Sequence, residues 1–110
     1  MINYTTPTIS LIVENIDFTD QDVYVTLEQG SHELTKSGDD LIISTETHGQ
    51  QTDTTIVFTL TQEESASFKI NGQVSIQVNF IDSSGVRSAT EIKNIGVMRN
   101  LLDEVIAYGN

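Results

Sequence analysis

The sequence contains no cysteine and no tryptophan among its 110 residues. Without cysteine there is no disulfide, no thiolate metal ligand and no thiol nucleophile, so packing alone must hold the fold together. Long apolar runs are also missing. Runs such as residues 11–13 and 41–43 fall far short of the roughly 20 residues of a membrane-spanning helix, and none exceeds four residues. Residues 1–6 lack the basic and apolar regions of a signal peptide, so we expect no export signal and no membrane partner.

Basic residues are scarce, because five Lys and Arg face sixteen Asp and Glu and give a formal charge of −11 at pH 7. Such a charge repels nucleic acid and anionic lipid unless the basic residues cluster on one face. The basic residues are instead scattered along the sequence at Lys36, Lys69, Arg87, Lys93 and Arg99. We therefore expect no nucleic-acid partner, and the acidity is typical of a surface that favours solubility.

The length is that of one domain, and 37% hydrophobic residues is typical of a globular chain. Apolar and polar residues alternate with period two over much of the chain, as in strands with one face on a core. The predicted strands cover residues 9–13, 23–27, 33–37, 41–45, 54–60, 74–80 and 86–97, the last with a bulge between Ile92 and Ile95. The predicted core residues are Val25, Phe58, Ile76, Val78 and Phe80.

Turn-forming residues separate these segments. Residues 29–32, 38–40 and 82–85 predict tight turns, and the polar stretch 48–53 predicts a mobile loop. Residues 61–64 read Thr-Gln-Glu-Glu and fit a capping box, which predicts a single helical turn across one end of a sandwich.

From Met98 onward the apolar spacing changes to three and four, which indicates a helix. The stripe consists of Met98, Leu101, Leu102, Val105, Ile106 and Tyr108. A helix of about two turns is unstable alone, so its apolar face must rest on the same domain or on a partner. We expect a β-sandwich over residues 1–97 and a short C-terminal helix over residues 98–110 that serves as the principal assembly element.

These patterns together predict an all-β, immunoglobulin-like antiparallel β-sandwich with a short C-terminal α-helix. The cysteine pair and core tryptophan of antibody domains are both absent, so the likeness concerns architecture alone. Ser75, Gln77 and Asn79 lie on the outward face of the clearest strand. They are predicted either to contact a protein partner without a charge penalty or to be solvated.

No residue pattern indicates catalysis. His32 and His48 fall in a predicted turn and a predicted loop, outside any zinc or nucleophile motif, and Ser83 and Ser84 lie in a tight turn. We therefore expect no enzymatic activity, no cofactor and no small-molecule substrate. Acidic turns occur at Asp17, Asp20, Asp22, Asp39 and Asp40. Their spacing does not match the calcium-binding helix-loop-helix motif, so no metal site is expected, although calcium binding by these loops is left open.

Three stretches matter together in this order: residues 60–64, residues 74–87 and residues 97–106. A capping box and a hairpin are common, so the distinctive part is the run Arg-Asn-Leu-Leu-Asp-Glu-Val in the last stretch. In this respect the chain resembles small tail and baseplate proteins of phages and prophages of Gram-positive bacteria, and the N-terminal domain of baseplate upper proteins. In the latter, an immunoglobulin-like domain precedes a helical linker and a domain that holds receptor-binding subunits. The chain departs from that pattern by stopping at Asn110, so the resemblance implies an anchoring domain alone.

Two functions are therefore expected as alternatives. The first is a non-enzymatic virion structural protein of the tail, the baseplate or another part of the particle, which assembles with other virion proteins and with copies of itself. The second is a carbohydrate-binding or adhesion module on a particle or cell surface, which the shortage of aromatic residues disfavours.

Overall fold

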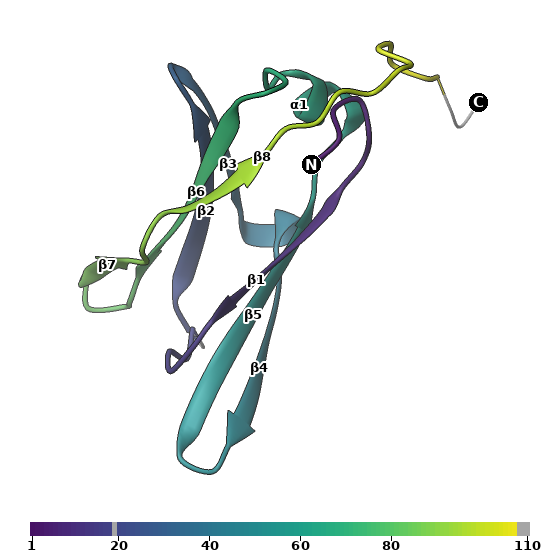
Figure 1. Cartoon of the computed structure of the whole chain (residues 1–110). Coiled ribbons are helices and arrows are strands. Elements are labelled where there is room, and N and C mark those ends of the chain that lie inside the picture. Colours follow the sequence, from purple (N-terminus) through teal and green to yellow (C-terminus); the bar gives the residue numbers. More distant parts are fainter. Residues whose placement is uncertain (19, 108–110) are drawn as a thin grey trace.

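The computed structural model describes residues 1–18 and 20–107, and it consists mainly of antiparallel β-structure (Figure 1). One short α-helix and one 3₁₀ turn interrupt the strands. The elements are β1 (Thr8–Val13), β2 (Asp22–Gln29), β3 (His32–Ser37), η1 (Gly38–Asp40), β4 (Ile42–His48), β5 (Gln51–Thr59), α1 (Gln62–Ala66), β6 (Gln73–Ile81), β7 (Arg87–Ala89) and β8 (Lys93–Gly96).

The strands form two antiparallel sheets. The smaller sheet has the order β1-β5-β4, and the larger has the order β3-β2-β6-β7, with β8 also paired to β6. The chain crosses from the larger sheet to the smaller at η1, and returns through α1. Figure 1 shows the two sheets side by side, with α1 at one end. The all-β prediction is therefore confirmed.

The core lies between the sheets, where the alternating apolar residues of both meet. All five predicted core residues are buried: Val25, Phe58, Ile76, Val78 and Phe80. They belong to one cluster that extends from Phe18 to Val97, so a single core joins both sheets. Pairing fixes this arrangement, because the partners Leu27 and Ile76 project to the same side of the larger sheet.

Helix α1 begins where the sequence predicts. The Thr61 hydroxyl accepts a bond of 3.1 Å from the Glu64 N–H, and the Glu64 carboxylate accepts one of 2.9 Å from the Thr61 N–H. This reciprocal pair satisfies two amide groups that would otherwise lack partners. The buried Ser65 hydroxyl then donates to the Thr5 carbonyl at 2.7 Å, which ties the helix to the N-terminal arm.

Two local predictions are wrong. Residues 48–53 do not form a separate loop, because β4 and β5 continue to a tight turn at Gly49, whose φ is +63°. The long strand predicted over residues 86–97 is two short strands. Between them, the Thr90 hydroxyl accepts a bond of 3.1 Å from the Val78 N–H of β6 and so takes the place of a backbone carbonyl of a paired strand. The break between β7 and β8 explains why the alternation of apolar and polar residues slips in this stretch, and it replaces the single bulge that the sequence predicts.

Candidate functional site

The C-terminal segment, residues 98–107, was predicted to be helical, and the structure contradicts this. No helix occurs there, and only Met98 belongs to any ladder, through an isolated parallel bridge to Ile2. Tyr108, the last residue of the predicted stripe, lies outside the described residues. Figure 1 shows the segment running past α1 and away from the sheets.

Hydrogen bonds to other parts of the chain explain why the helix is absent. The Asn100 N–H donates to Asn3 Oδ1, and Asn100 Nδ2 donates to the Asn3 carbonyl, each at 3.1 Å. The side-chain amide of Gln62 on α1 holds both backbone groups of Ile106, at 2.8 and 3.0 Å. In a helix the Ile106 N–H would donate to the Leu102 carbonyl instead. The segment is thus pinned at both ends in a non-helical path.

The predicted interaction residues of this segment are all exposed. Leu101 is 86% exposed, and Met98, Leu102, Val105 and Ile106 are each exposed by about half. Ile106 lines a hollow of about 890 Å³ together with residues of the N-terminal arm and of the start of α1. The segment therefore combines a hydrogen-bonded backbone with apolar side chains in solvent. We call Met98, Leu101, Leu102, Val105 and Ile106 the C-terminal patch.

The other predicted interaction residues lie on the outer face of the larger sheet, opposite the buried residues of β6. Each forms a hydrogen bond with a neighbouring residue. The Ser75 hydroxyl donates to Asn94 at 2.8 Å, and Gln77 donates to the Thr90 carbonyl at 2.9 Å. Asn79 accepts from the Arg87 guanidinium at 3.2 Å. The hydrogen bonds of Ser75 and Gln77 therefore hold residues 90–94 of the same chain against β6.

Tyr24 and Arg87 were not predicted, yet they join Asn79 on this outer face. Together with Thr26, Thr35 and Ile81 they line a hollow of about 420 Å³. Tyr24 on β2 pairs directly with Asn79 on β6, which in turn neighbours β7. Because these residues come from strands far apart in sequence, alternation within one strand could not have grouped them.

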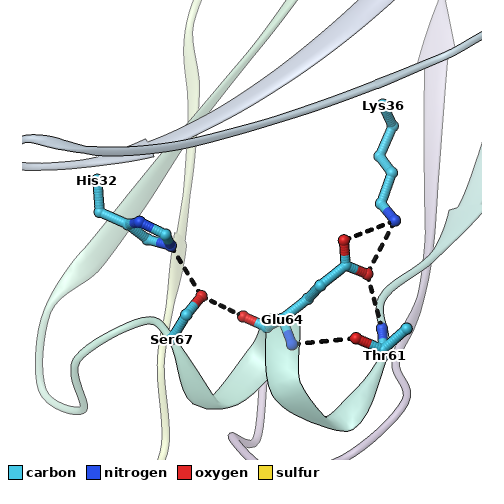
Figure 2. Close-up of polar contacts among 5 residues, drawn as sticks. All are labelled: His32, Lys36, Thr61, Glu64 and Ser67. Atoms are coloured by element: carbon cyan, nitrogen blue, oxygen red, sulfur yellow. Dashed lines mark hydrogen bonds and ion pairs between the residues drawn. The ribbon is translucent and has the colours of Figure 1, made fainter.

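A polar network joins the β2–β3 hairpin to α1 (Figure 2). The Lys36 ammonium lies 2.8 Å from both carboxylate oxygens of Glu64. His32 Nε2 lies 2.8 Å from the Ser67 hydroxyl, and the His32 ring packs on Phe68 with centroids 4.9 Å apart. Partial burial would raise the pKa of Glu64, but the hydrogen bonds from Lys36 and Thr61 outweigh it and hold that pKa below its ordinary value.

The His32–Ser67 pair has the distance of a base and a nucleophile, but its hydrogen-bond pattern differs from an activated serine. The Ser67 hydroxyl donates to the Glu64 carbonyl at 2.5 Å. His32 Nε2 must then be the donor to Ser67 Oγ, so it cannot accept the hydroxyl proton. The pair locks the hairpin to the helix. His48, the other histidine, lies 3.4 Å from Glu46 on the exposed β4.

The acidic loops do not converge on a common point. Among residues 1–18 and 20–107, no three His, Asp or Glu side chains come together as ligands for one metal ion. In the turn after β6, Asp82 Oδ1 accepts from the Ser84 hydroxyl at 2.7 Å and from the Val86 N–H at 3.0 Å. These bonds, that from Ser84 foremost, lower the pKa of Asp82. None of the helices in the described chain has the length and apolar character needed to cross a membrane.

Comparison with known proteins gives no relative, since no protein-family model, no curated protein and no solved structure matches the chain.

Proposed function

We propose that the chain is a non-enzymatic assembly or anchoring domain of a phage particle, located in the tail, the baseplate or another part of the virion. The C-terminal patch carries this proposal. Its five apolar side chains remain in solvent although the backbone around them is hydrogen-bonded to Asn3 and Gln62. Burying an apolar side chain of this size contributes about 1.5 to 3 kcal/mol, so a partner that covers the patch gains substantially.

An immunoglobulin-like sandwich is the finer form of the fold that we infer. The order β1-β5-β4 facing β3-β2-β6-β7 corresponds to the second, fifth and fourth strands of such a domain facing an extended sheet of the third, sixth and seventh. In this reading the first strand is missing from the described structure. The resemblance to baseplate domains supports the same architecture, and it implies other virion proteins and further copies of the chain as partners.

The role without catalysis is supported by the polar chemistry of the surface. The Ser67 proton is donated to a backbone carbonyl, and Lys36 is neutralised by Glu64. The uncompensated negative charge of the chain favours protein partners over nucleic acid. A virion location requires no substrate, cofactor or membrane contact.

The test is production of particles with the C-terminal patch altered. Leu102→Ser combined with Ile106→Ser removes apolar side chains that are about half exposed, so the domain should fold while incorporation into particles falls sharply. Ile42→Ser combined with Ile92→Ser is the matched control, because both isoleucines are at least as exposed and neither lines the hollow that Ile106 lines. Equal incorporation of both double variants would contradict the proposal.

A second function, binding of carbohydrate, is favoured by one observation. The hollow beside Tyr24 combines an exposed aromatic ring with the Asn79 amide and the Arg87 guanidinium, the groups that stack on and hydrogen-bond to a sugar ring. Titration of the labelled protein with cell-wall oligosaccharides, followed by NMR, tests it. Chemical-shift changes that are confined to this hollow and abolished by Tyr24→Ala would support sugar binding. The absence of such changes would contradict it.

A further inference from the structure

Strand β1 has one unpaired edge. It pairs with β5 over residues 8–13, and within the described chain no strand lies on its other side. The Leu60 N–H donates to the Pro7 carbonyl at 3.0 Å. Because hydrogen-bonded and non-bonded positions alternate along an antiparallel strand, Thr8, Ser10 and Ile12 direct their backbone groups toward the free edge. These groups can be satisfied by water or by another strand.

The edge lacks the features that normally prevent edge-to-edge pairing. Charged side chains, proline and irregular backbone are the usual protection. Every other edge strand of the described structure carries a charge: Glu33 and Lys36 on β3, Glu46 on β4, Arg87 on β7 and Lys93 on β8. Residues 8–13 read Thr-Ile-Ser-Leu-Ile-Val and contain none, in a chain of net charge −11. Ile12 in addition is 57% exposed.

A cleft beside β1 opens toward the core. It has a volume of about 370 Å³ and is lined by residues of two parts of the chain. One part supplies Leu11, Ile12, Val13, Glu14 and Ile16, and the other supplies Ile76, Val78, Thr90, Glu91 and Lys93. Leu11 and Val13 pair with residues of β5 that face the core, so they point to the inner side and are only half-buried. A strand added at this edge would place its own inward side chains over the mouth of the cleft.

We propose that this edge pairs with β1 of a second copy, in antiparallel register about Leu11, to form a continuous six-stranded sheet across a two-fold axis. The sequence is self-complementary in this register. Leu11 meets Leu11, and Ile9 meets Val13, all on the inner face, while Ser10 and Ile12 face one another outside. The outward backbone groups of Ser10 and Ile12 then bond to each other across the axis.

This inference rests on the proposed assembly role, because it names the surface through which copies join. It leaves the C-terminal patch free for other virion proteins. The patch residues Met98 and Ile106 are anchored near the N-terminal arm and α1, whereas the cleft is lined by the far end of β1. The net charge makes two copies repel, so pairing should strengthen as salt rises.

Sedimentation equilibrium from micromolar to millimolar protein tests the pairing. The wild type should show a reversible monomer–dimer equilibrium. Ile12→Lys places two ammonium groups near the axis and should weaken dimerisation by at least about tenfold. Ile42→Lys is the matched control, because Ile42 is an exposed isoleucine on the outer face of the opposite edge strand. The Ile42→Lys variant should change the dissociation constant by less than about twofold. Its melting temperature shows whether it folds.

A cross-link supplies a second readout. The chain has no cysteine, so Leu11→Cys introduces a single thiol. At the axis the two Cα atoms would be about 4.5 Å apart, which permits a disulfide. Mild oxidation should yield covalent dimer, whereas Ser44→Cys on β4 should not. A monomeric wild type at millimolar concentration would overturn the inference, as would association lost in the Leu102→Ser, Ile106→Ser variant but retained in Ile12→Lys. Neither result would contradict the proposed assembly role. That role is contradicted separately if the protein is absent from particles.

Discussion

Replacing Phe80 by alanine should destabilise the domain more than any surface change. Phe80 is 9% exposed on β6, and its ring lies 4.5 Å from that of Phe18, at 58°. Truncating a buried phenylalanine costs about 3 to 5 kcal/mol, of which the aromatic pair accounts for about 0.5 to 1.5. That is a large share of the roughly 5 to 15 kcal/mol that stabilises a domain.

Urea unfolding followed by circular dichroism measures this loss. Thermal unfolding gives a second measure of the loss. At about 4 °C or more per kcal/mol for a domain of this size, the melting temperature should fall by at least about 12 °C. Val86→Ala is the control, because Val86 is exposed and should cost under about 0.5 kcal/mol. A double-mutant cycle with Phe18→Ala isolates the ring pair. A loss below about 1 kcal/mol for Phe80→Ala would refute the burial of Phe80 in the core.

Three further results are expected. Glu64→Gln should reduce stability above pH 4.5, the ordinary pKa of the carboxyl, and the deficit should vanish as the pH falls through the lowered folded pKa; a deficit independent of pH, measured by thermal melts, would show that charge plays no part. Millimolar calcium should leave the melting midpoint where sodium chloride of equal ionic strength leaves it, and a rise of several degrees would reveal a site in the acidic loops. Leu102→Ser with Ile106→Ser should change the unfolding free energy by less than about 0.5 kcal/mol per site, because both side chains are exposed. A large fall in the melting temperature would instead place the segment in the core.

The strands could be predicted because burial of one face imposes period two on the sequence. Val74 to Phe80 is the clearest case, and the structure buries every second residue there. The capping box was equally readable, since its two hydrogen bonds join residues three apart. Both signals are local.

The C-terminal segment could not be predicted in the same way. Its stripe of apolar residues favours a helix, but the outcome depends on Asn3 and Gln62, which lie far away in sequence and compete for the backbone of Asn100 and Ile106. The open edge of β1 is likewise invisible to alternation, because it depends on which strand is missing beside it. The grouping of Tyr24 with Arg87 also depends on strand order.

Mass spectrometry of purified particles tests the assembly role most directly. Particles from a host that expresses the chain together with its neighbouring genes would be purified, washed at high salt and digested. The protein should be recovered in constant proportion to the major virion proteins, and the variant with Leu102→Ser and Ile106→Ser should be depleted from the particles. Abundant protein in the lysate with none in the particles would contradict a virion role.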